Sequence, residues 1–286
     1  MAALTLDGAL ASAAARLTAP AFAPGSVWLV GAGPGDPGLL TLHAVHALAS
    51  ADVVLHDALV PPEILALVEH GRLESVGKRA GRPSPRQMRI NQHLIQLARR
   101  GLRVVRLKGG DPLVFGRGGE EALALAAAAV PFRIVPGLSA GIGGLASAGI
   151  PLTHRTLGRS AVFVTGHDAS GHLPHGTDWA ALARGGDVLV LYMALRQIAA
   201  IAGRLIAAGR SPNEPVAFVS DASTPRQLVR LATIGTAAAV AETMPPGPPM
   251  LIVVGPVVAL RAMLAPWQDA TPMTQRAAAR RAPASA

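Results

Sequence analysis

The sequence predicts an α/β protein made of two domains, each with a mainly parallel sheet. Short apolar runs alternate with segments of helical spacing along most of the chain, which is typical of parallel strands joined by helices. Half of the 286 residues are hydrophobic, but only 3% are aromatic. The cores must therefore be built from Ala, Val, Leu and Ile, which suit buried parallel strands covered by Ala-rich helices.

The expected strands are apolar runs that end at glycine, proline or polar turn residues. In the first domain they cover residues 27–30, 52–55, 73–77, 103–107 and 132–135. In the second domain they cover 161–165, 187–192, 216–220, 250–254 and a further strand or short ladder at 227–232. Helical spacing predicts helices over 39–50, 63–70, 87–100, 120–129 and 139–148. Thr41 is the expected cap of the first helix.

The composition divides the chain into four parts. We expect a disordered N-terminal extension (1–25), a first α/β domain (26–152), a second α/β domain (153–264) and a disordered Ala/Arg/Pro tail (265–286). The N-terminal segment lacks the basic start of a secretory signal. No apolar run reaches the ~18 residues of a membrane span, so we expect no membrane partner and a cytoplasmic protein.

The net charge of +9 is concentrated in one part of the sequence. Thirteen basic residues and four acidic residues lie between Arg72 and Arg133. This excess indicates either a solvated basic face or a rim that attracts an anionic partner. Nucleic acid would also suit the charge, but aromatic stacking residues are nearly absent, which disfavours it. The chain has no cysteine, and no His-x-x-x-His pair with a nearby carboxylate, so we expect no metal.

A glycine-rich turn follows the first expected strand. Residues 33–38 match G-x-G-x-x-G, and Asp57 ends the next strand, as in a dinucleotide-binding fingerprint. Pro34 and Pro37 lie inside the turn, however, and neither has an N–H to offer a pyrophosphate. The turn could therefore lie close to a flat or uncharged ligand but is a poor phosphate site, although a nicotinamide-dependent oxidoreductase stays open as an alternative.

The loop over 108–120 is more specific. Five of its thirteen residues are glycine, which indicates close backbone approach or positive φ. Asp111 in this loop could hydrogen-bond an amino or hydroxyl group of a ligand. The chain has only two lysines, Lys78 and Lys108, against 24 arginines. A lysine can release a proton when its environment lowers its pKa, whereas an arginine cannot.

These segments resemble a known family. Residues 104–112 and 115–121 resemble the signature of the uroporphyrinogen-III C-methyltransferases, which are S-adenosylmethionine (SAM)-dependent tetrapyrrole methyltransferases. Further stretches match in order, at residues 31–36, 77–79, 90–91, 135–137, 149–155 and 164–167. The likeness covers roughly residues 27–262, and several motifs in sequence are more specific than any one alone.

The resemblance implies a homodimer in which SAM binds in an active-site cleft between the two domains of each subunit. It implies cofactor contacts at Pro34, Gly109, Gly110, Asp111, Val114, Ser139, Ala140, Met193 and Ala222. It makes Asp57 the proton acceptor and Lys78 the proton donor. The implied reaction converts uroporphyrinogen III to precorrin-2 by two ring-carbon methylations, on the way to siroheme, cobalamin or both.

The implied substrate carries acidic side chains, which basic residues at the cleft would bind. Our candidates for pairing with these carboxylates are Arg79, Arg106, Arg117 and Arg155.

Three residues depart from the family pattern. Ala194 replaces the usual Gly, Pro83 the usual His, and Ser147 a frequent Tyr. These differences bear on rate and substrate fit more than on the type of reaction. Two further hypotheses stay open, namely a methyltransferase that acts on a later corrin intermediate and a basic nucleic-acid-binding protein.

Overall fold

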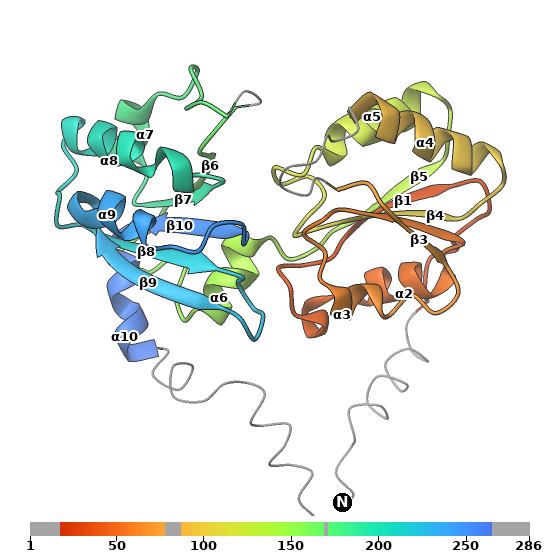
Figure 1. Cartoon of the computed structure of the whole chain (residues 1–286), viewed down its shortest axis with the longest axis horizontal. Coiled ribbons are helices and arrows are strands. Elements are labelled where there is room, and N and C mark those ends of the chain that lie inside the picture. The colour runs from red at the N-terminus through yellow and green to blue at the C-terminus, as the bar shows by residue number, and fades with distance from the viewer. Residues whose placement is uncertain (1–17, 78–86, 169–170, 265–286) are drawn as a thin grey trace, which may run out of the picture.

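The computed structural model describes residues 18–77, 87–168 and 171–264, and they form two lobes that each contain a five-stranded sheet (Figure 1). The first sheet consists of β1 (Val27–Gly31), β2 (Val53–His56), β3 (Arg72–Ser75), β4 (Val104–Lys108) and β5 (Phe132–Val135). The second consists of β6 (Ala161–Thr165), β7 (Val188–Tyr192), β8 (Pro215–Ser220), β9 (Leu228–Thr233) and β10 (Met250–Val254). All ten strands lie where the sequence predicts them.

The first sheet is entirely parallel, with the strand order β3-β2-β4-β1-β5. Helices cover both of its faces (Figure 1). One face carries α2 (Leu42–Ser50) and α3 (Pro62–Leu65), and the other carries α4 (Gln87–Arg99) and α5 (Gly118–Ala127). Strands buried on both faces explain why these runs are continuously apolar rather than alternating.

Local signals set the helix ends in this domain. The hydroxyl oxygen of Thr41 accepts a hydrogen bond from the Ala44 N–H at 3.2 Å, as expected for the cap of α2. Helix α3 is shorter than the predicted 63–70. After Leu65 the backbone changes to three-residue turns, in which Val68 N–H bonds the Leu65 carbonyl at 3.1 Å. The predicted helix therefore begins in the right place, but the α-helical hydrogen bonds do not continue to residue 70.

The second sheet, which we predicted to be mainly parallel like the first, has the order β6-β7-β10-β8-β9 and mixed directions. Strands β6 and β7 are parallel, whereas β10 runs antiparallel to both β7 and β8, and β9 runs antiparallel to β8. One face packs against α7 (Trp179–Gly185), α8 (Ile198–Ala207) and α9 (Ala237–Glu242). The other face packs against α6 (Leu145–Ser147) and the short helix η5 (Pro256–Leu260), which α10 (Arg261–Leu264) follows.

The chain passes from one lobe to the other before residue 152, the predicted end of the first domain. Leu145, Ala148 and Ile150 are buried in the core of the second sheet, beside Val188 and Ala217. The predicted helix over 139–148 is a π-helical turn, η2 (Ala140–Gly144), followed by α6. This segment therefore belongs to the second lobe by packing, and the connection lies directly after β5.

Residues 18–25, which we expected within a disordered extension, pack on the first domain. Phe22 is buried and stacks on Trp28 with ring centroids 4.5 Å apart. Gly25 N–H bonds the Leu102 carbonyl at 3.1 Å. One aromatic side chain thus anchors a segment whose average composition indicates disorder. The predicted extension before residue 18 and the predicted tail after 264 lie outside the described residues. Within the part of the chain that is described, no helix has the length and apolar character needed to cross a membrane.

Candidate active site

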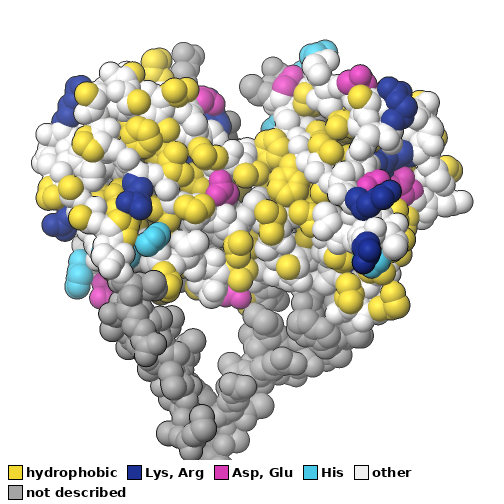
Figure 2. Space-filling model, turned by 180° about the vertical axis from the view of Figure 1, so that it is seen from behind, with side chains coloured by type: hydrophobic (Ala, Val, Ile, Leu, Met, Phe, Trp, Pro, Cys, Tyr) yellow, Lys and Arg dark blue, Asp and Glu magenta, His cyan; other side chains and the backbone are white. Residues whose placement is uncertain are grey.

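A cavity of about 1030 Å³ lies between the two domains. Figure 2 shows the molecule from behind as two rounded bodies with a notch between them. The cavity wall from the first domain comes from the loops after β1, β2, β3 and β4. The second domain contributes the loops after β6, β7 and β8. Ligands collect at the carboxyl ends of strands in α/β sheets, and here the ends of both sheets face one space.

Glycine is needed where the first-domain loops touch. A Cβ atom on Gly31 would lie 2.5 Å from the Gly137 nitrogen and 2.6 Å from the Gly110 carbonyl oxygen. Gly33 and Gly110 exchange backbone hydrogen bonds of 3.2 and 2.8 Å. The loops after β1, β4 and β5 are therefore in direct backbone contact, which only residues without a side chain permit.

Asp111 joins two of these loops. Its Oδ1 atom accepts a hydrogen bond from Leu113 N–H at 2.8 Å, and its Oδ2 atom accepts one from Gly137 N–H at 3.2 Å. The sequence suggested that this carboxylate could bind a ligand. In the structure both of its oxygens hold the loops in shape, and the residue still lines the cavity.

The nine residues that the resemblance assigned to the cofactor all line this one cavity. They are Pro34, Gly109, Gly110, Asp111, Val114, Ser139, Ala140, Met193 and Ala222. Met193 has a φ of 55°, and Ser223, which follows Ala222, has a φ of 62°. Left-handed backbone at residues other than glycine stores strain and is concentrated at ligand sites.

Polar contacts hold Tyr192 in place within the second lobe, and one further polar contact joins the two domains. The hydroxyl groups of Ser139 and Tyr192 are 2.6 Å apart, and the Tyr192 oxygen also accepts from Gly141 N–H at 2.8 Å. Between the two domains, Asp36 N–H donates to the Ser223 hydroxyl at 3.2 Å. Tyr192 also packs against Phe115 of the first domain, with ring centroids 4.8 Å apart. Burial raises the pKa of Tyr192, so its hydroxyl stays neutral.

The floor of the cavity carries Asp57, whose side chain is 28% exposed. Its Oδ1 atom accepts a hydrogen bond from a terminal nitrogen of Arg106. Its Oδ2 atom lies 3.9 Å from Nζ of Lys108. Both cations lie on β4, two residues apart, so they point to the same face of the sheet.

A buried carboxylate completes this group. Glu121 on α5 is fully buried, and its Oε1 atom accepts from Arg106 Nε at 2.9 Å and from Lys108 Nζ at 3.2 Å. Gln87 on α4 donates to the same oxygen at 3.0 Å. We did not assign a role to Glu121 or Lys108 from the sequence. The signal was the second Glu of the Gly-Gly-Glu-Glu stretch, which falls on the inward side of α5.

The four arginines predicted to bind carboxylates have different environments. Arg106 lines the cavity but is only 2% exposed, and its guanidinium is taken up by Asp57 and Glu121. Arg117 lines the cavity and is largely exposed, with Glu120 bonded to its Nε at 2.8 Å. Arg155 is exposed and does not line the cavity. Arg79, together with Lys78 and Pro83, lies outside the described residues.

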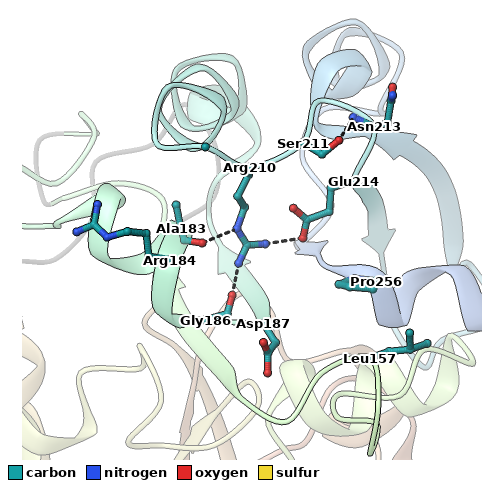
Figure 3. Close-up of a pocket in the computed structure, with 11 residues that line it drawn as sticks. Leu157, Ala183, Arg184, Gly186, Asp187, Arg210, Ser211, Asn213, Glu214 and Pro256 are labelled. Atoms are coloured by element: carbon teal, nitrogen blue, oxygen red, sulfur yellow. Dashed lines mark hydrogen bonds and ion pairs between the residues drawn. The ribbon is translucent and has the colours of Figure 1, made fainter.

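A second hollow, of about 500 Å³, lies at the other end of the second sheet (Figure 3). Arg210 extends into it and donates to the Ala183 carbonyl at 3.2 Å, to Glu214 at 2.6 Å and to the Gly186 carbonyl. These contacts clamp the turns that precede β7 and β8 (Figure 3). The hollow lies at the start of β7, whereas Tyr192 at the end of β7 lines the cleft. Arg210 and Glu214 in this hollow therefore hold the turns of the second domain together.

No group of three or more His, Cys, Asp or Glu side chains suited to a metal ion occurs among the residues that the structure describes. The turn after β1 also differs from a dinucleotide site. It leads into the three-residue helix η1 (Pro37–Leu39), and the Asp36 carboxylate accepts from Gly38 N–H at 2.8 Å. No long helix begins there to receive a pyrophosphate.

Two α/β domains joined over one cleft, with glycine backbone on the wall and a carboxylate on the floor, define the chain as a two-domain enzyme with its site at the domain junction. The chain belongs to the tetrapyrrole (corrin/porphyrin) methylases, whose family model matches residues 26–238.

Three similar proteins are informative. A uroporphyrinogen-III C-methyltransferase of a Sinorhizobium species is 58% identical, over 86% of this chain and 88% of its own length. A uroporphyrin-III C-methyltransferase from Thermus thermophilus, solved with S-adenosylhomocysteine, is 42% identical with a TM-score of 0.71, over 82% of this chain and 99% of that one. Siroheme synthase 1 of Yersinia enterocolitica is 49% identical, and the match covers 88% of this chain but only 53% of that protein.

Proposed function

We propose that this protein transfers methyl groups from SAM to two ring carbons of uroporphyrinogen III in succession and so forms precorrin-2. The observation that carries the proposal is one cavity lined by all nine expected cofactor residues, with the Asp57 carboxylate on its floor. The 58% identical relative bears the name of this activity. The precorrin-2 formed would supply siroheme or cobalamin synthesis.

The cavity suits SAM better than a dinucleotide. Its walls are mostly apolar or glycine backbone, and the turn after β1 contains two prolines without N–H groups. When bound, SAM supplies a methyl group on a positively charged sulfur. The protein's first task is to hold that methyl group in line with a ring carbon and to keep water out.

The ring then needs a base. A pyrrole carbon uses its π-electron pair to form the new bond to the methyl carbon, and the carbon–sulfur bond breaks with its electron pair going to sulfur. The ring is left with a positive charge until a C–H proton departs and its electron pair stays in the ring. Asp57 is our proposed acceptor of that proton. Its Oδ1 atom is held by Arg106, and the side chain reaches the cavity.

The remaining sequence-based assignments are parts of the same proposal. Lys78 acts as the proton donor, and Arg117 and Arg79 bind the acidic side chains of the substrate. Arg155 is not included, because it does not line the cavity. The protein acts without a bound metal, works in the cytoplasm and forms a homodimer. Light scattering of the purified protein tests the dimer directly.

The central test is an anaerobic incubation of the purified protein with uroporphyrinogen III and methyl-labelled SAM, followed by mass analysis of the pigment. We expect a gain of two labelled methyl groups without added nicotinamide. SAM binding without ring labelling would point instead to a later corrin intermediate as substrate. No SAM binding in calorimetry would overturn the proposal.

Asp57→Asn tests the base. The variant keeps the shape of the side chain but lowers its basicity, so we expect kcat to fall by about 10²-fold or more. The Kd for S-adenosylhomocysteine should stay within about twofold, because the cofactor contacts do not change. An Asp57→Asn enzyme with unchanged kcat would remove Asp57 from the mechanism.

A further inference from the structure

Four charged side chains at the cavity floor form one connected set of ion pairs. Arg106 and Lys108 supply two positive charges, and Asp57 and Glu121 supply two negative charges. Three of the four are almost completely buried, and only Asp57 reaches the cavity to a substantial degree. The neighbours of these cations on β4, Val105 and Leu107, are apolar and fully buried.

Such a set is costly to bury for stability alone. Removing two ion pairs from water carries a desolvation penalty that their mutual attraction does not reliably offset, and apolar side chains would fill the same space at no such penalty. Charged clusters of this kind are concentrated where a reaction needs a tuned acid or base. Here the set includes Asp57, which is one of two carboxylates, with Asp111, that line the described part of the cavity.

The contacts show which charged groups surround Asp57 and how they are held. Glu121 bonds Arg106 at Nε, which leaves a terminal nitrogen of the guanidinium to donate to Asp57. Glu121 also holds Lys108, with Nζ 3.1 Å from Oε2. Among the described residues, the remaining titratable neighbour of Asp57 is His56, whose Nδ1 lies 3.1 Å from the Asp57 carbonyl oxygen. Glu120, next to Glu121, turns outward to Arg117.

We propose that Glu121 and Lys108 are positioning residues that balance the charge around Asp57 and thereby set the pH range in which Asp57 accepts the ring proton. This inference rests on the proposed function and adds two residues to it. Glu121 neutralises one of the two cations, so that Asp57 faces a single net positive charge. Lys108 in turn balances the negative charge of Glu121.

The electrostatics of the individual groups agree with this arrangement. Burial opposes the charge on Arg106, but Asp57 and Glu121 outweigh it and raise the pKa of Arg106, so the guanidinium stays charged. Burial, together with the charge of Arg106, lowers the pKa of Lys108, although both carboxylates act in the opposite direction.

For two near-isosteric variants we expect the acid limb of the kcat–pH profile to move in opposite directions. Glu121→Gln leaves two cations around Asp57, which favours its ionised form, so the acid limb of the kcat–pH profile moves to lower pH. Lys108→Met leaves two carboxylates and one cation, so that limb moves to higher pH. We expect displacements of about one pH unit and a fall of about tenfold in kcat at neutral pH for Glu121→Gln.

The double variant Glu121→Gln with Lys108→Met restores the balance, because only the Arg106–Asp57 pair remains. Its acid limb should return to within about 0.3 pH units of the wild-type position. Glu74→Gln is the matched control, since Glu74 is also an ion-paired glutamate of the first domain but does not line the cleft. Its pH profile should match that of the wild type.

The measurement is labelled-methyl transfer to uroporphyrinogen III across the acid, neutral and alkaline range, with S-adenosylhomocysteine binding and thermal unfolding recorded for every variant. Displacement of both single variants in the same direction, or a lower kcat with no displacement, would overturn the inference. If a single variant does not fold, the double variant decides, because a displaced limb there also contradicts charge balance. An inactive wild type that binds SAM would contradict the proposed function instead.

Discussion

Arg106 and Asp57 form an ion pair across adjacent strands, between β4 and the end of β2. The guanidinium also donates to the carbonyl of Leu107 at 3.2 Å and to Glu121 at 2.9 Å. A side chain with these contacts orients the carboxylate on the cavity floor and has little capacity left for a substrate.

Replacement of Arg106 by Met should therefore lower kcat and stability together. Loss of one partner from a buried ion pair leaves an uncompensated charge and costs about 3–5 kcal/mol. Urea unfolding measures the stability, and steady-state kinetics separate kcat from KM. Arg117→Met is the comparison, because Arg117 is largely exposed and should lose no more than about 1 kcal/mol. A raised KM with normal kcat and stability in the Arg106 variant would indicate direct substrate binding instead.

Gly137 should not tolerate a side chain. Its Cβ atom would overlap the Gly110 carbonyl oxygen and the Gly31 backbone, so Gly137→Ala must separate the loops that line the cavity. We expect at least tenfold weaker binding of S-adenosylhomocysteine in calorimetry and a lower melting temperature. Gly203→Ala in α8 is the control, because apart from its chain neighbours and the backbone of its own helix nothing lies within 4 Å of the added Cβ. That variant should gain about 0.5–1 kcal/mol from helix propensity and bind normally.

Glu74 should make stability depend on acid pH. Partial burial raises the pKa of Glu74, but the hydrogen bond with His93 at 2.7 Å and the charge of Arg72 outweigh it, so the pKa lies below the ordinary 4.5. A lowered folded-state pKa adds stability above pH 4.5 that is lost as pH falls through the folded value. Glu74→Gln should thus be less stable by up to about 1 kcal/mol at neutral pH, with the difference vanishing in acid. Urea unfolding at several pH values measures this, and a difference independent of pH would contradict it.

Ala194, which departs from the family pattern, should have little effect on the cofactor. The residue lines the cavity, but it is only 1% exposed, has a φ of −98° that needs no glycine, and packs in the core of the second domain. Ala194→Gly should change the Kd for S-adenosylhomocysteine by less than about twofold in calorimetry and lower stability by about 0.5–1 kcal/mol. A clearly tighter complex would show that the methyl group crowds the ligand.

The sequence predicted the strands and loops of this protein well, because each depends on a local pattern. The apolar runs ending at Gly31 and Lys108 become buried strands whatever lies beside them, and the glycines that follow carry their own backbone requirement. The direction of the strands in the second sheet, by contrast, does not depend on a local pattern. Met250–Val254 is apolar on both faces and would look the same parallel or antiparallel, so only its position between β7 and β8 decides its direction.

The residues of the cavity floor show the same division between what a local pattern predicts and what the tertiary arrangement decides. The sequence by itself placed Asp57 at a strand end, and the resemblance assigned it a role, but its partners come from other places in the chain. Glu121 lies 64 residues away from it along the sequence, on a helix that packs over the sheet. An exposed arginine and a buried, fully bonded one look alike in a sequence, because burial depends on which elements cover the side chain. The tertiary structure alone therefore decided that Arg106 holds Asp57 and that Glu121 holds Arg106.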